Sequence, residues 1–565
     1  MKKTIQLLAA ITTVVLTACR TEQTAVVTAA ENEASNPSRP NILLIVADDL
    51  GMLDIGAFGS EIRTPNIDKL ARSGISFNNF YTSATCSPTR AMLLSGTDSH
   101  TAGLGNMVEH MAPNQRGKSG YEGHLSSNIV SVATLLRDNG YRTYMAGKWH
   151  LGMKYEQLPY NRGFDESFAL MQGGSSYFND MMGLTSKVPR AHYRRNGDIV
   201  TELPSDFYSS EYYASFIIDQ LKADKATGKP FFAYLAFTAP HWPLQVKDEH
   251  LNLYQGRYDQ GYDALYEKRV AAAKKHGVFP PDVHDSQPPA HIKPWSSLSE
   301  QEQRRQSRTM EIYGAVVERM DHHLGRVIEH LKDSGELNNT LIVFMSDNGA
   351  DGSDRSKLPG NDTWLPQAWN LSYENMGRIG SYVYPGAAWA RTSVGPYRMY
   401  KSFLSEGGIK SPAIIVHPNL NASNTMTNEF ITVKDITPTI LDYADVRHPG
   451  THYQGRAVKP PTGVSLLPFL TGRDNNPHRP DEIIGWELFG QKAIRKDNWK
   501  LVHLSSKPKW LVKPDLSDQW ALYNLAEDPT ELNDLSAVEA QIFSEMKKHW
   551  QEYATKQKVV LPEWK

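Results

Sequence analysis

The sequence predicts an α/β protein with a large, doubly wound, mostly parallel sheet and a small α+β domain at its C-terminal end. Apolar runs of strand length alternate with amphipathic helix patterns along most of the chain. These runs are apolar at consecutive positions, which is typical of parallel strands buried on both faces. From about residue 478 the pattern changes to alternation around an Asp-Asn turn, which indicates an antiparallel hairpin.

Residues 1–19 predict an export signal, because two lysines precede an apolar run that is too short for a stable membrane span. The run ends in LTAC, which resembles a bacterial lipobox with Cys19 as the acylated residue; an ordinary cleaved signal is the alternative. Residues 20–39 are polar and suit a flexible tether. We expect a protein exported to the periplasmic face and anchored to the outer membrane through Cys19. The outer-membrane placement depends on Arg20, rather than Asp, following the cysteine.

Residues 40–477 predict the main α/β domain. Its expected strands are NILLIVA (41–47), RTYMAG (142–147), PFFAYLAF (230–237), TLIVFMS (340–346) and PAIIVH (412–417). Its expected helices lie within 128–140, 212–224 and 313–335. Two long excursions, 256–299 and 352–395, interrupt this pattern and have the length of functional loops or lids.

Residues 478–565 predict a small C-terminal domain. Residues 482–504 alternate in polarity and form the expected hairpin, and residues 536–556 have the pattern of an amphipathic helix.

The net charge and the number of cysteines limit the classes of function that the sequence suggests. The formal net charge is -2, so the sequence gives no reason to expect a nucleic-acid partner. Only two cysteines are present, and a lipidated Cys19 leaves Cys86 without a disulfide partner. Cys86 is therefore either a small buried hydrophobic residue or a chemical group.

Two of the expected strands end in oxygen-bearing side chains. These side chains belong to Asp48, Asp49, Asp347 and Asn348. Ligands bind at the carboxyl ends of strands in an open parallel sheet, and oxygen donors favour Ca²⁺ or Mg²⁺ over zinc. Either pair alone would more simply be a turn or a helix cap, but the repeated arrangement favours a metal site.

The segment CSPTR begins a helix-compatible stretch, because Pro88 suits a first helical turn. Cys86 would then lie at a helix N-terminus, which favours anions, and Arg90 would lie on the same face. A thiolate nucleophile of lowered pKa is the generic inference.

The pattern C-x-P-x-R followed by an apolar segment and SG resembles the sulfatase signature, whose cysteine is oxidised to formylglycine. GYRTYMAGKWHLG is similar to the second signature of that family, and PNILLIVADDLG, SDNGA and KSFLSEGGIKSP occur in the family order. The resemblance covers nearly the whole chain after the tether, and GPYRMYKSFLSEGG resembles bacterial arylsulfatases in particular.

The resemblance implies an alkaline-phosphatase-like fold and hydrolysis of sulfate esters by a formylglycine hydrate made from Cys86. It implies one calcium ion, with Mg²⁺ the weaker candidate, and a maturation enzyme that generates the formylglycine. The implied metal ligands are Asp48, Asp49, Cys86, Asp347 and Asn348. The implied catalytic residues are Cys86, Arg90, Lys148, His150, His241 and Lys401. The resemblance also implies that His241 protonates the leaving group and that His150 is the base which releases sulfate.

Alternatives remain open at this point. The natural substrate could be a sulfated carbohydrate, or a phosphodiester or phosphonate ester. A chain whose Cys86 stays a thiol would be a lipoprotein that only binds sulfated ligands. The aromatic residues of 352–395, including Trp389, could line the site or pack the loop. Asp321, His322 and His323 are expected on a solvated helix face, since adjacent helical positions do not face one ligand.

Overall fold

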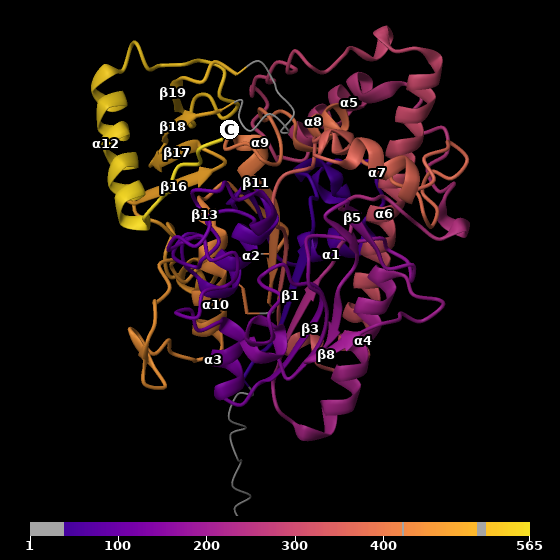
Figure 1. The fold of residues 1–565 in the computed structure, drawn as a ribbon. Coiled ribbons are helices and arrows are strands. Elements are labelled where there is room, and N and C mark those ends of the chain that lie inside the picture. Colours follow the sequence, from indigo (N-terminus) through magenta and orange to yellow (C-terminus); the bar gives the residue numbers. More distant parts are fainter. Residues whose placement is uncertain (1–38, 418, 421–422, 506–515, 565) are drawn as a thin grey trace, which may run out of the picture. The chain divides into compact units, whose positions relative to one another are not determined.

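The structure is a computed structural model that describes residues 39–417, 419–420, 423–505 and 516–564. The predicted signal and lipobox, and residues 20–38 of the predicted tether, lie outside the described residues. Figure 1 shows the central sheet running through the fold. Among the helices of the described residues, none is both long enough and apolar enough to cross a bilayer.

The central sheet has 11 strands in the order β12-β2-β11-β10-β1-β9-β3-β4-β7-β8, and β13 pairs with β2. The strands are β1 (Asn41–Ala47), β2 (Ile75–Tyr81), β3 (Arg142–Lys148), β4 (Glu166–Leu170), β7 (Tyr193–Arg195), β8 (Asp198–Val200), β9 (Phe231–Ala236), β10 (Thr340–Ser346), β11 (Lys410–Val416), β12 (Thr425–Thr427) and β13 (Ile431–Thr432). The five central strands β10, β1, β9, β3 and β4 are parallel, whereas β11, β7 and β8 pair antiparallel with their neighbours. The predicted mostly parallel sheet is confirmed.

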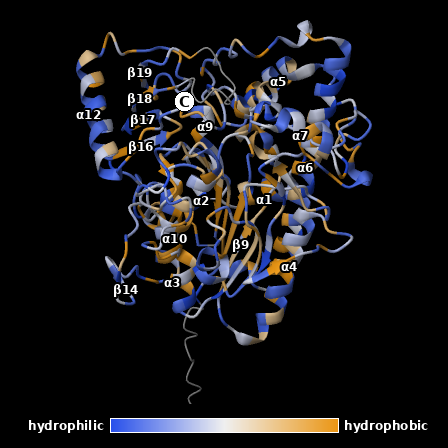
Figure 2. Cartoon of the chain, in the orientation of Figure 1, coloured by the Kyte–Doolittle hydropathy of each residue, from blue (hydrophilic) through white to orange (hydrophobic). Residues whose placement is uncertain are grey.

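Every residue of β1 is buried, because both faces of the sheet are covered. Leu43 and Ile45 pack with α1 (Pro65–Ser73), α4 (Ser209–Asp224) and α6 (Glu300–Asp333). Ile42 and Leu44 pack on the opposite face with α2 (Cys86–Ser95), α3 (Val132–Asp138) and α10 (Ile436–Tyr443). Figure 2 shows these strands as the apolar centre of the fold. Each such side chain contributes roughly 1.5–3 kcal/mol by burial, so the consecutive apolar pattern of the strands is what selects the doubly wound arrangement.

A separate antiparallel sheet follows near the C-terminus. Its strands are β16 (Ile483–Leu488), β17 (Gln491–Lys496), β18 (Trp499–His503) and β19 (Trp520–Asn524). The helix α12 (Ala540–Gln557) packs Met546 and Trp550 against Ile494 and Leu501 of this sheet. The predicted small α+β unit is confirmed, while its exact boundary at residue 478 stays a prediction.

The two excursions carry helices of their own. These are α5 (Gly261–Lys275) in the first, and α7 (Asn361–Ala368) and α8 (Ala387–Val394) in the second. Trp389 is 1% exposed, and its ring packs edge-on against Tyr258, Tyr262 and Trp295. Trp389 therefore joins the two excursions as a packing residue.

The prediction of a solvated face at residues 321–323 is wrong for two of the three side chains. Asp321 is 1% exposed and accepts hydrogen bonds from the backbone N–H groups of Asn66 and Ile67 at the start of α1. His323 is 4% exposed. Burial of α6 against α1 and α4 overrides the polar sequence pattern.

Candidate active site

The carboxyl ends of β1 and β10 bring the predicted oxygen donors together. The two strands are adjacent and parallel, with Ala47 paired to Ser346, so Asp48 and Asp347 leave the sheet at the same edge. The backbone of Asp49 has φ +68° and turns its N–H toward Asp347 Oδ1 at 3.2 Å. The predicted convergence of these residues is therefore a consequence of strand register.

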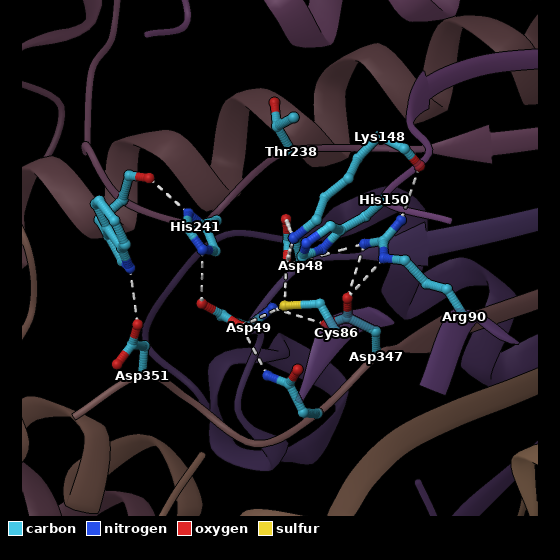
Figure 3. Close-up of polar contacts among 12 residues, drawn as sticks. Asp48, Asp49, Cys86, Arg90, Lys148, His150, Thr238, His241, Asp347 and Asp351 are labelled. Atoms are coloured by element: carbon cyan, nitrogen blue, oxygen red, sulfur yellow. Dashed lines mark hydrogen bonds and ion pairs between the residues drawn. The ribbon is translucent and has the colours of Figure 1, made fainter. Parts of the chain in front are cut away.

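Cys86 joins this group as the first residue of α2. Its Sγ lies 3.4 Å from Asp48 Oδ1 and 3.9 Å from Asp49 Oδ1. One atom from each of Cys86 and the three aspartates falls within a group whose members lie no more than 4.8 Å apart. Figure 3 shows the sulfur facing the carboxylates. Burial, together with the charge of Asp347, raises the pKa of Cys86 well above its ordinary value, so the inference of an activated thiolate is wrong for the unmodified residue.

Each carboxylate is matched to one buried cation. Lys148 Nζ lies 2.9 and 2.7 Å from the two oxygens of Asp48. Arg90 contacts Asp347 Oδ2 through Nε at 2.9 Å and Nη2 at 2.8 Å, and donates from Nη1 to the Lys148 carbonyl at 3.0 Å. In this forked contact only Nε makes a hydrogen bond, and Nη2 makes an ion-pair contact with the same oxygen; together they hold the guanidinium in position.

Lys401 reaches the third carboxylate. Its Nζ lies 2.6 Å from Asp49 Oδ1 and 2.8 Å from Oδ2. Gly349 lets the segment after β10 approach α9 (Glu406–Ile409) closely, since a Cβ on Gly349 would lie 2.1 Å from the Gly407 carbonyl oxygen. Burial alone would lower the pKa of Lys401, but Asp49 raises it above its ordinary value, so this residue is an ammonium ion at neutral pH.

The surroundings shift the pKa values of Asp48 and Asp347 in opposite directions. Burial is the main reason that the pKa of Asp48 rises to about 7, with Asp347 and Asp49 adding to it and Lys148 opposing. For Asp347 burial acts in the same direction, but Arg90 and Lys148 outweigh it and hold the pKa below its ordinary value. A crowded set of buried acids of this kind favours an additional cation.

The two predicted histidines occupy different surroundings. His241 Nδ1 lies 2.5 Å from the Trp242 carbonyl oxygen, and His241 Nε2 lies 3.7 Å from Asp49 Oδ2. Burial, followed by the charges of Lys401 and Lys148, lowers the pKa of His241 well below its usual value. His241 is therefore neutral, with the lone pair of Nε2 on the side of Asp49. His150 instead contacts Glu109, with His150 Nε2 and Glu109 Oε1 2.9 Å apart.

The donor set fits a hard dication. Oxygen atoms of three aspartates converge, and the amide oxygen of Asn348 is buried without a hydrogen-bond partner in the described part of the chain. The amide nitrogen of Asn348 donates to Asp49 Oδ1 at 2.6 Å, which holds the side chain at the cluster. A buried oxygen that accepts no hydrogen bond and lies beside carboxylates is suited to bind a hard cation.

Asp351 and Arg355 also lie at this site, although no pattern in the sequence pointed to them. Asp351 accepts from the Trp242 indole at 2.8 Å and from Arg355, whose guanidinium lies 4.6 Å from the Trp242 ring centroid. Tyr382 packs against Trp242, and Trp369 packs against Tyr382; both belong to the aromatic residues of 352–395 that were predicted either to line the site or to pack the loop. No motif spacing links Asp351 and Arg355 to the other site residues; their place at the site follows from contacts, since Asp351 Oδ2 lies 3.9 Å from Lys401 Nζ.

A family model described as Sulfatase matches residues 40–446, and the model of the C-terminal region of N-sulphoglucosamine sulphohydrolase matches residues 395–557. An uncharacterized sulfatase of Schizosaccharomyces pombe is 42% identical over 94% of this chain and 96% of its own length. The arylsulfatase of Klebsiella aerogenes is 39% identical over 77% of this chain and 92% of its own.

Solved structures agree with this match. The crystal structure of Ps i-CgsB in complex with k-i-k-neocarrahexaose has a TM-score of 0.63 and 25% identity, and the alignment covers 93% of this chain and 95% of that one. The family model spans most of the main domain, including both predicted metal-binding strand ends and the CSPTR segment. The chain belongs to the sulfatase family and is a sulfuric ester hydrolase.

Proposed function

We propose that this sulfatase cleaves aryl sulfate esters with a formylglycine generated from Cys86. The observation that carries the proposal is the position of Cys86: a lone, buried thiol at the start of α2, in contact with two aspartates. The family match and the CSPTR motif support its oxidation by a separate maturation enzyme. The hydrated aldehyde would carry two hydroxyls in place of one thiol.

A calcium ion would be held by Asp48, Asp49, Asp347, Asn348 and the modified residue 86. When bound, it would supply charge that stabilises an ionised hydroxyl and a sulfate oxygen. Three carboxylates are paired with Lys148, Arg90 and Lys401, so the formal charges of these six side chains cancel. A dication would make it positive and attractive to an anionic ester.

The side chains then have distinct tasks. One hydroxyl of residue 86 attacks sulfur, and the bond between sulfur and the leaving oxygen breaks. Lys401, held as an ammonium ion by Asp49, can stabilise that oxygen. His241 is neutral at rest and can donate a proton only after an entering sulfate anion raises its pKa. His150 removes the proton of the second hydroxyl, and sulfate leaves as the aldehyde re-forms.

The similar proteins support either an aryl or a saccharide group as the leaving group of the substrate. The match to an arylsulfatase at 39% identity favours the first. The likeness to a structure in complex with a neocarrahexaose favours a sulfated saccharide as the second candidate. Comparing kcat/KM for an aryl sulfate, a sulfated oligosaccharide and the matching aryl phosphate diester would decide among these. The highest value on the phosphate diester would contradict the proposal.

The direct test of the mechanism is peptide mass spectrometry of the CSPTR segment in protein from the native host. Formylglycine at residue 86 together with sulfate release is the expected result. An unmodified thiol in protein that releases no sulfate would instead identify a binder of sulfated ligands.

We also propose export and lipid anchoring through Cys19, on the basis of the N-terminal sequence alone. Cys19→Ala should move the enzyme from the membrane fraction to the soluble fraction. Continued sedimentation of the variant with membranes would contradict the anchor.

A further inference from the structure

Glu109 lies in a short 3-10 turn, Val108–His110, between α2 and α3. Its Oε1 lies 2.9 Å from His150 Nε2. The His150 side chain is 7% exposed, whereas that of Glu109 is 36% exposed. The carboxylate thus bridges the buried histidine and the outer part of the site.

The contact with Glu109 determines which nitrogen of His150 carries the proton. A carboxylate accepts a hydrogen bond, so Nε2 carries the proton that faces Glu109. The other nitrogen, Nδ1, is buried and has no hydrogen-bond partner among the described residues. In a neutral imidazole the proton-free Nδ1 holds the lone pair. It is the atom that can accept a proton.

We propose that Glu109 is the positioning residue of a Glu109–His150 dyad, which fixes the histidine in the tautomer that can act as a base. The inference rests on the proposed function, in which His150 drives sulfate release. Figure 3 draws His150 with Lys148 and Arg90, whose charges act on it.

The step assisted by the dyad can be written with its atoms balanced. The sulfated residue 86 carries one free hydroxyl and one sulfate on the same carbon. His150 Nδ1 takes the hydroxyl proton, and the carbon–oxygen double bond forms. The bond between that carbon and the sulfate oxygen breaks, and sulfate leaves with the electron pair. Glu109 stays ionised and stabilises the imidazolium.

The turn that carries Glu109 is held from both sides. Met107 and Met111 are buried, and Asn106 Oδ1 accepts from the Met107 N–H at 2.8 Å. The His110 ring packs edge-on at 6.1 Å from Phe489, in the turn between β16 and β17. The C-terminal sheet therefore supports the position of Glu109, which gives this unit a role beside the active site.

The charges around His150 set the direction of the pH effect. Burial lowers the pKa of His150 below its ordinary value, Glu109 opposes that, and Lys148 and Arg90 add to it. The pKa of Glu109 falls to about 2 against the effect of burial, because His150 and, less strongly, His110 favour its ionised form. Loss of the Glu109 charge therefore lowers the pKa of His150 further. The base then stays unprotonated to lower pH.

The experiment uses the full-length, formylglycine-containing enzyme and its Glu109→Gln and Glu109→Ala variants. Glu156→Gln, at an exposed glutamate, is the matched control. We expect kcat to fall by about tenfold to a hundredfold in Glu109→Ala, the range for a lost hydrogen bond to a charged group, with KM nearly unchanged. We also expect the acid limb in the plot of kcat against pH to move to lower pH in both Glu109 variants. The sulfated form of the enzyme should accumulate, which intact-mass spectra would show.

Several results would overturn the dyad. Unchanged kcat and an unchanged acid limb in both variants would show that Glu109 does not act on His150. A lower KM with higher kcat would show that the carboxylate merely occupies the substrate site. The isosteric glutamine variant keeps the test valid if the alanine variant does not fold. A wild-type enzyme without formylglycine would refute the proposed function instead, so the two failures are distinguishable.

Discussion

Lys401→Met tests whether the buried ammonium group of Lys401 both balances the charge of Asp49 and contributes to catalysis. Lys401 is 3% exposed, and its ammonium contacts both oxygens of Asp49 at 2.6 and 2.8 Å. Methionine keeps most of the volume and removes the charge. Removing one partner of a buried ion pair costs about 3–5 kcal/mol, because the other charge stays buried without compensation. We therefore expect the free energy of unfolding to fall by that amount.

Activity should fall separately from stability. A preorganised cation at the reacting centre contributes roughly 3 kcal/mol to transition-state stabilisation, or on the order of a hundredfold in kcat. The double variant Lys401→Met/Asp49→Asn removes both charges, so it should regain most of the lost stability without regaining activity.

Urea unfolding in the presence of a chelator measures the first effect without a contribution from bound metal. Steady-state hydrolysis at 25 °C by the variants that remain folded measures the second. Lys118→Met, at an exposed lysine, is the control for loss of a positive charge. A stability loss below about 1 kcal/mol in the single variant would refute charge compensation at Asp49. Recovery of kcat in the double variant would refute a direct role for Lys401.

Three further predictions concern residue 86, its guanidinium neighbour and the metal. Cys86→Ser keeps one hydroxyl but lacks the second, so it should take up sulfate once and stall; intact-mass analysis after substrate exposure checks this, and sustained turnover would contradict it. Arg90→Lys cannot reproduce the forked contact with Asp347, so kcat should fall about a hundredfold, and wild-type activity would contradict the assignment. Chelation should abolish activity, and Ca²⁺ should restore it better than Mg²⁺. Calcium at about 100 times its Kd should raise the free energy of unfolding by about 2.7 kcal/mol, measured as a rise in Tm that Mg²⁺ does not match.

Several features of the fold and site were predictable because they depend on local patterns. Continuous apolar runs predicted the strands β1, β9 and β10, since a strand buried on both faces needs no alternation. Polar residues directly after two such strands predicted a shared edge. Pro88 and the helix-compatible residues after it placed Cys86 at a helix start, where α2 begins.

Other features depend on packing between distant segments. The polar pattern of α6 predicted a solvated Asp321, but the helix lies against α1 and buries that residue as a cap. The helix-start motif suggested an activated thiolate, but burial beside carboxylates raises the pKa of Cys86. In both cases tertiary burial outweighs a local propensity.

The sequence by itself determined the fold class and the family and predicted several residues that meet at the strand ends, because apolar periodicity and ordered motifs are local properties of the chain. Only the tertiary structure decided which cation pairs with which carboxylate, that burial lowers the pKa of His241, and that Glu109 contacts His150. Lys401 and Asp49 are 352 positions apart, and Glu109 and His150 are 41 apart. Side-chain contacts across such separations depend on how loops pack at the sheet edge, and no local spacing encodes them.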